Sequence, residues 1–114
     1  MASRGDVLVS RRRLGFSGPG RDERFVVLQA DGFEPLLDTV LVAPLDEVRS
    51  VYERDPMAVR ISAQEAGTAT DRVVLPANLS SVRLVRFEQD VVGRLKQESM
   101  GAIETAIRVL LALD

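Results

Sequence analysis

The sequence contains no cysteine and no histidine, and these two absences exclude much of protein chemistry. Without cysteine there is no disulfide, no thiolate metal ligand and no cysteine nucleophile. Without histidine the chain lacks the commonest general acid–base group and the commonest ligand of transition metals. A catalytic site must therefore use arginine, carboxylates, the hydroxyls of serine and threonine, the single tyrosine Tyr52 or the single lysine Lys96.

Long apolar runs are also missing from the chain. The longest unbroken run, residues 109–113, has five residues and is far too short to span a bilayer. The first residues carry no apolar stretch behind their charges, so we expect no secretory signal and a cytoplasmic protein. With 114 residues, 46% of them apolar and 28% charged, the chain has the size and composition of one soluble globular domain.

Charge is distributed unevenly, although the net charge is only −2 and excludes a globally basic nucleic-acid binder. Six arginines fall within the first 24 residues, and seven acids follow within residues 31–55. A basic arm on an acidic body can attract a polyanion locally while the remainder repels it. Two solvated faces are the alternative, and charge counts by themselves favour that alternative.

Short apolar runs bounded by turn residues predict a series of strands. These runs lie at residues 7–9, 25–29, 39–43, 59–61 and 73–75, and residues 82–87 are a further candidate. We expect Pro44 to end the third strand. Residues 46–55 are expected to form a short surface helix or an ordered loop, and residues 64–71 a loop.

The clearest pattern is an apolar stripe near the C-terminus. Its members recur every three or four residues, as on one face of a helix: Met100, Ile103, Ile107, Leu110 and Leu111. Strands come first and a helix last, without alternation of the two. The sequence therefore predicts an α+β fold in a single domain, residues 1–114: a small curled antiparallel β-barrel of five to seven short strands, with the C-terminal amphipathic helix packed on it.

Arg24 stands at the start of an apolar strand, close after a loop rich in glycine at residues 15–20. A guanidinium on the end of a rigid strand, beside such a loop, is suited to bind a phosphate. An ordinary solvated strand end is the alternative, and residues 24–29 alone favour it.

Four motifs occur in an order that resembles the MazF/PemK toxins of bacterial toxin–antitoxin pairs, whose fold is shared with the CcdB toxins. They are Arg-Gly-Asp-Val at residues 4–7, an arginine and an apolar strand ending in glutamine at 24–29, Thr-Val-Leu-Val-Ala-Pro at 39–44, and Val-Gly-Arg-Leu at 92–95 before the closing helix. Each motif is common by itself, but together they cover nearly the whole chain in the family's order.

The resemblance implies a homodimeric, metal-independent endoribonuclease that needs no cofactor. It implies a cognate antitoxin whose short acidic C-terminal segment covers the RNA groove. It also implies sequence-selective cleavage of single-stranded RNA, in which the ribose 2′-hydroxyl attacks the adjacent phosphate and leaves a 2′,3′-cyclic phosphate and a 5′-hydroxyl. This step needs a base near the 2′-oxygen, charge stabilisation at the phosphorane and a proton for the leaving oxygen.

Two catalytic residues are predicted from the resemblance, Arg24 and Asp46. Arg24 matches the family's arginine, which contacts the scissile phosphate and serves in proton transfer. Phe25 stands where the family has proline, and Asp46 stands where it has threonine or serine. A hydroxyl can donate a hydrogen bond to the phosphorane, whereas an ionised carboxylate repels it, so Asp46 would have to act as the base instead.

Five further residues are predicted to contact RNA: Ser17, Arg21, Arg11, Arg13 and Asn78. Ser17 lies near the loop position at which many members carry an acid, and the acids Asp22 and Glu23 come slightly later. Alternation along a strand would place Arg11 and Arg13 on one face, where solvation or pairing with the antitoxin is the alternative to RNA. Asn78 lies near a polar residue of the family that could contact a base edge, and a turn residue after Pro76 is its alternative.

Two other functions remain open at this point. A CcdB-like toxin, which inhibits DNA gyrase by binding rather than by chemistry, would also lack the usual ribonuclease residues, and Asp46 favours this alternative. That activity is associated with a Trp-Gly-Ile tail, whereas this chain ends in Ala-Leu-Asp and has no tryptophan. A catalytically weakened relative that only binds RNA or a partner is the third function.

Overall fold

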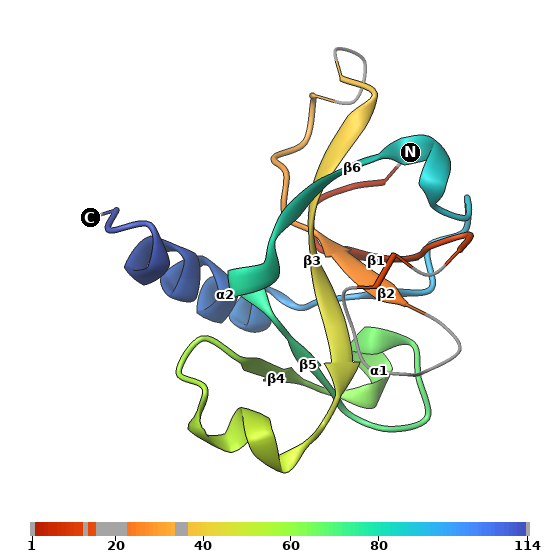
Figure 1. Ribbon diagram of the computed structural model, residues 1–114. Coiled ribbons are helices and arrows are strands. Elements are labelled where there is room, and N and C mark those ends of the chain that lie inside the picture. Colours follow the sequence, from red (N-terminus) through yellow and green to blue (C-terminus); the bar gives the residue numbers. More distant parts are fainter. Residues whose placement is uncertain (1, 13, 16–22, 34–36, 114) are drawn as a thin grey trace.

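One antiparallel sheet of seven strands curls through the part of the chain that the computed structural model describes, residues 2–12, 14–15, 23–33 and 37–113 (Figure 1). The strands are β1 Asp6–Val9, β2 Arg24–Val27, β3 Thr39–Glu47, β4 Val59–Ile61, β5 Arg72–Val74, β6 Ser80–Arg83 and β7 Gly93–Arg94. The α-helices are α1 Ala63–Ala66 and α2 Gln97–Leu110, and the 3-10 helices are η1 Ser50–Arg54, η2 Pro76–Asn78 and η3 Leu84–Arg86. The α+β fold with a curled sheet and a C-terminal helix is thereby confirmed.

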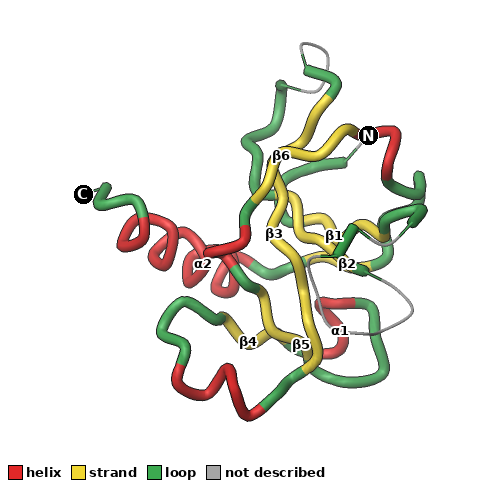
Figure 2. Tube along the Cα trace, in the orientation of Figure 1, coloured by secondary structure: helices red, strands yellow, loops and turns green. Residues whose placement is uncertain are grey.

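The long strand β3 is the centre of the sheet, whose strand order is β4-β5-β3-β2-β1-β7. One edge of β3 pairs with β2, and the other edge pairs first with β6 and then with β5. Figure 2 shows β6 beside one half of β3 and β5 beside the other half. This exchange of partners divides β3 into two halves with different surroundings.

Pro44 does not end the third strand, so that sequence expectation was wrong. The strand β3 continues through Pro44 to Glu47, and Pro44 lies opposite Phe25 of β2. On the other edge, the backbone N–H of Leu75 donates to the carbonyl of Pro44 at 2.9 Å, and the chain then turns away into η2. Proline cannot return a hydrogen bond to the Leu75 carbonyl, but this is the end of the β3–β5 ladder, and that carbonyl accepts from the Asn78 N–H at 3.0 Å instead.

Residues 64–71 were expected to form a loop, but they begin within the short helix α1. Ser62 and Glu65 form a capping box, in which the Ser62 Oγ accepts from the Glu65 N–H at 3.2 Å and the Glu65 carboxylate accepts from the Ser62 N–H at 3.0 Å. Gly67 ends the helix in the left-handed conformation, with a φ of 71°. The Ser-x-x-Glu…Gly pattern at residues 62–67 was the signal for this helix, and the sequence analysis missed it.

Residues 82–87 form a strand only in part. The strand β6 ends at Arg83, and the 3-10 helix η3 follows it. The expectation for residues 46–55 is confirmed, because η1 is a short surface helix without a buried residue. The remaining predicted strands lie within one or two residues of their expected positions.

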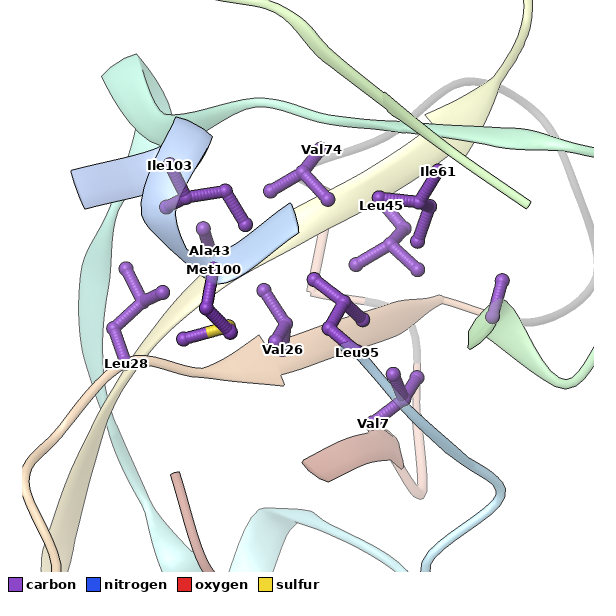
Figure 3. Packing of buried hydrophobic residues seen from close by; sticks show 11 residues of the cluster. Val7, Val26, Leu28, Ala43, Leu45, Ile61, Val74, Leu95, Met100 and Ile103 are labelled. Atoms are coloured by element: carbon purple, nitrogen blue, oxygen red, sulfur yellow. The ribbon is translucent and has the colours of Figure 1, made fainter. Parts of the chain in front are cut away.

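Alternation along the strands sends apolar side chains to two faces of the sheet. On one face, Val26, Ala43 and Leu45 pack with Met100 and Ile103 of α2 (Figure 3). On the other face, Phe25 and Phe87 belong to a second cluster, and their rings meet edge to face at 5.5 Å between centroids. The curled sheet therefore has a core on each side.

The predicted apolar stripe lies along α2, as expected, but only part of it is buried. Met100 and Ile103 are buried, whereas Leu110 and Leu111 are exposed, Leu111 to 54%. Figure 1 shows the C-terminal end of α2 pointing away from the sheet. The last turn of the helix therefore presents an apolar surface that the described residues do not cover.

Candidate active site at the end of the central strand

Arg24 is the first residue of β2 and lies between Val9 of β1 and Leu45 of β3. The residue is half-buried, and its Nη1 is a buried donor without a hydrogen-bond partner among the described residues. Ser10, Gln29 and Arg72 also have such an atom, but the first two are uncharged and Arg72 faces Glu47 at 3.9 Å. A buried guanidinium N–H without an acceptor is costly, and an anion is the kind of ligand that would satisfy it.

Asp46 lies near the end of β3, only 6% exposed, and its carboxylate accepts hydrogen bonds from three donors. Oδ1 accepts from the backbone N–H of Glu47 at 2.8 Å. Oδ2 accepts from the Tyr52 hydroxyl at 2.5 Å and from Nε of Arg49 at 3.3 Å. Burial, together with the hydrogen bond and the charge of Asp46, raises the pKa of Tyr52 to about 12, so its hydroxyl remains a donor at neutral pH.

Arg24 and Asp46 lie at the same end of the sheet but do not point the same way. Leu45 is the direct cross-strand partner of Arg24, so Asp46 is the next residue along β3. Side chains alternate along a strand, and the two residues therefore leave the sheet on opposite faces. The register of the sheet therefore does not bring the Asp46 carboxylate to an anion that is bound on the face of Arg24.

Glu23 is a further residue of this region, which the sequence analysis treated only as an acid out of place. It is 2% exposed, and its carboxylate accepts from the backbone N–H of Gly15 at 3.0 Å and from that of Leu14. Its carbonyl accepts from the N–H of Ser10 at 3.1 Å. Glu23 thus ties residues 14–15 to the start of β2, directly beside Arg24.

The other predicted RNA contacts do not form one site with Arg24 in the described residues. Arg11 follows β1, donates through Nε to the carbonyl of Val85 at 3.0 Å and pairs with Glu88 at 3.4 Å. Asn78 ends η2 beside the middle of β3, and its carbonyl accepts from the Ser80 hydroxyl at 3.1 Å, as a turn residue would. Ser17, Arg21 and Arg13 lie outside the described residues.

Two further properties of the described residues concern metals and membranes. No three or more carboxylates are grouped so that they could hold a metal ion. No helix in this part of the chain has the length and apolar character that crossing a membrane requires.

The family of PemK-like, MazF-like toxins of type II toxin–antitoxin systems matches residues 4–111. The chain belongs to this family. The resemblance seen in the four sequence motifs is thereby confirmed. No curated protein sequence matches the chain significantly.

Solved structures of toxins share the fold of this PemK/MazF family member. An endoribonuclease from a mycobacterial species, in complex with its cognate antitoxin, is similar with a TM-score of 0.77 at 18% identity, over 100% of this chain and 98% of the other. The Mycobacterium tuberculosis toxin MazF-mt6 gives 0.76 at 21% identity, over 96% and 98%. MazF in a MazE–MazF structure from Deinococcus radiodurans gives 0.76 at 13% identity, over 99% and 97%. At these sequence identities the similarity shows the fold alone. The roles of individual residues in this chain must therefore be argued from the geometry of its own site.

Proposed function

We propose that this PemK/MazF family toxin is a metal-independent endoribonuclease that cuts single-stranded RNA at selected sequences. One observation carries the proposal: the half-buried Arg24 has a guanidinium N–H without an acceptor among the described residues, on the end of a strand held by two cores. An N–H of this kind, fixed before the substrate binds, can stabilise charge that develops on a phosphate.

The proposed reaction is attack of the ribose 2′-oxygen on the adjacent phosphorus. The 2′-oxygen loses its proton, the P–O bond to the next 5′-oxygen breaks, and that oxygen gains a proton, which leaves a 2′,3′-cyclic phosphate and a 5′-hydroxyl. Arg24 binds the phosphate and stabilises the phosphorane, and its donors face the oxygens that exchange protons. The role of Asp46 as the base stays a prediction, and its three existing hydrogen bonds disfavour it.

The proposed partners are a second copy of the chain and an antitoxin. A toxin of similar fold has been solved with its cognate antitoxin, and we propose for this chain a cytoplasmic homodimer that an antitoxin with a short acidic C-terminal segment neutralises. The exposed apolar residues Val109, Leu110 and Leu111 at the end of α2 provide a surface for such contacts.

The test is to incubate the purified protein with a long single-stranded RNA in EDTA and to map the cut ends. We expect discrete cuts with 5′-hydroxyl ends that Arg24→Ala abolishes. Arg108→Ala is the control, because this arginine is exposed near the end of α2 and has no ion pair among the described residues. Intact RNA together with inhibited gyrase supercoiling would instead establish the CcdB-like function, and inactivity in both assays would leave a binding protein.

A further inference from the structure

The proposed reaction needs a base, and the carboxylates nearest to Arg24 in the sequence cannot supply it. A general base must lie within hydrogen-bond reach of the 2′-hydroxyl and must keep a lone pair for its proton. Asp46 lies on the face opposite Arg24, is only 6% exposed and already accepts three hydrogen bonds. Glu23 is 2% exposed and is held by the backbone N–H of Gly15. Neither carboxylate is available to a phosphodiester that Arg24 binds.

Glu47 is the carboxylate that the register of the sheet does place on the face of Arg24. Leu45 is the direct cross-strand partner of Arg24, and direct partners share a face of the sheet. Glu47 follows Leu45 by two residues along β3, so alternation returns it to the same face. Residues in this diagonal relation lie about 7–8 Å apart, a separation that long side chains span. A phosphodiester bound by Arg24 is therefore within reach of Glu47.

The Glu47 carboxylate also keeps lone pairs for a proton. Its side chain is 56% exposed, and it accepts no hydrogen bond from the described residues. Its ion-pair partners in this part of the chain are Nη2 of Arg49 at 3.7 Å and Nη1 of Arg72 at 3.9 Å. These distances are longer than hydrogen bonds, so they leave the oxygens free to accept one. Glu47 is therefore both accessible and able to take a proton.

A second arginine lies beside Glu47 on the same face. Arg72 of β5 is the direct cross-strand partner of Glu47, and its Nε is buried without a hydrogen-bond partner among the described residues. Arg24 is the only other arginine with such an atom in that part of the chain. The two guanidinium groups therefore flank β3 on one face, and their positive charge offsets the repulsion between Glu47 and a phosphate.

We propose that Glu47 is the general base of the ribonuclease site. The proposal rests on the proposed ribonuclease function and names the residue that takes the 2′-proton. Glu47 removes the proton of the 2′-hydroxyl as the 2′-oxygen forms its bond to phosphorus, while Arg24 holds the phosphate. The bond from phosphorus to the 5′-oxygen breaks, and this oxygen takes a proton from water. The hydroxide that remains is neutralised by the proton that Glu47 had taken, which restores the carboxylate.

The test compares the cleavage kinetics of wild type, Glu47→Gln and Glu53→Gln on the same single-stranded RNA in EDTA. Glu47→Gln keeps the size of the side chain but cannot take a proton, so kcat should fall about 100-fold or more while KM stays within about threefold. Glu53→Gln is the matched control, because this exposed acid lies on η1 and has no ion pair among the described residues. The control loses the same charge and should keep both constants of the wild type.

The failure of this inference and the failure of the proposed function give different results. Wild-type protein that leaves the RNA intact would overturn both. Cleavage by the wild type that Glu47→Gln retains would overturn only the assignment of the base. Because Glu47 is exposed, the variant should unfold at the temperature of the wild type, and thermal unfolding checks that a lost rate does not come from a lost fold.

A small carboxylate added to the solution separates a base from a structural residue. Glu47→Ala leaves space at an exposed position, where formate can take the place of the lost carboxylate. Formate should raise the cleavage rate of Glu47→Ala about tenfold or more, with saturation, since it restores a proton acceptor. It should not restore Arg24→Ala, which lacks the group that binds the phosphate. A Glu47→Ala rate that formate leaves unchanged would overturn the role of Glu47 as the base.

Discussion

Among the charged side chains that the described residues hold away from solvent, Arg24 and Glu65 are satisfied to opposite degrees. At the start of β2, Arg24 keeps a buried N–H without an acceptor among the described residues. At the junction of α1 and α2, the Glu65 carboxylate accepts from the Ser62 N–H and hydroxyl at 3.0 and 3.1 Å and from the Lys96 N–H at 3.1 Å. A fully satisfied buried charge stabilises the fold, whereas an unsatisfied one is held ready for a ligand.

The largest expected effect is the loss of RNA cleavage when Arg24 is replaced. Arg24→Ala should lower the rate of RNA cleavage about 100- to 1,000-fold, the usual cost of losing a preformed donor to a transition-state oxyanion. Because the variant also removes an unsatisfied buried donor, its melting temperature should not fall. Cleavage rates and thermal unfolding measured on the same sample check both statements, and a variant that loses stability as well would place Arg24 among the structural charges.

The next largest effect is expected on the stability of the fold, from a substitution at Gly93 beside the backbone of Glu65. A Cβ added to Gly93 would lie 2.3 Å from the carbonyl oxygen of Glu65, so Gly93→Ala should lower the free energy of unfolding by about 3 kcal/mol. Gly101→Ala is the matched control, since a Cβ there meets nothing within 4 Å and the helix should gain about 0.5–1 kcal/mol. Urea unfolding measures both variants, and equal stabilities would mean that β7 and α1 do not pack this closely.

Glu65→Gln should have a somewhat smaller effect, about 2 kcal/mol, because hydrogen bonds to a charged acceptor are weakened. Burial pushes the pKa of Glu65 up, but hydrogen bonds from Ser99, Ser62 and Lys96 outweigh it and hold the pKa below its usual 4.5. The charged form is therefore favoured by folding, and its contribution is full above pH 4.5 and is lost as the pH falls through the lowered folded pKa. The stability difference between wild type and variant should shrink in acid, and a constant difference would contradict this linkage.

The smallest expected effect concerns the pKa of Tyr52, which is measured at high pH. Its folded pKa of about 12 lies above the ordinary 10.0, so its contribution to stability is full below pH 10 and is lost as the pH rises through the folded pKa. Titration of the phenolate absorbance should give the raised pKa in wild type. Asp46→Asn should bring it closer to 10.0, because the negative charge is removed while burial remains. An unchanged pKa would mean that Asp46 contributes little to it.

Much of the fold followed from local patterns in the sequence. The strands and the helix α2 were predictable because short apolar runs and a three-to-four spacing report directly on burial. Pro44 misled the prediction, because a missing N–H costs little at the end of a ladder where the partner carbonyl, here that of Leu75, accepts from another donor. The short helix α1 was missed because its capping box at Ser62 and Glu65 lies in a small, polar segment.

The candidate site was less predictable than the fold. Sequence placed Arg24 at the start of its strand, and the structure has it there. It could not show that Asp46 is held by Tyr52 and Arg49, because these contacts depend on how the chain turns after β3. The burial of Glu23 beneath residues 14–15 was equally hidden, since an acid next to an arginine is usually a surface pair.

Pro44 has one more consequence, for misfolding rather than for catalysis. A curled sheet built on one long strand is open to register slips, in which β5 or β6 pairs with β3 one residue out of place. Such a slip would move a ladder hydrogen bond toward the Pro44 nitrogen, which has no hydrogen to donate. The native alignment places that nitrogen at the end of the β3–β5 ladder, where β5 gives way to η2 and the Leu75 carbonyl accepts from Asn78. A residue that seemed to interrupt the strand therefore penalises its incorrect pairings.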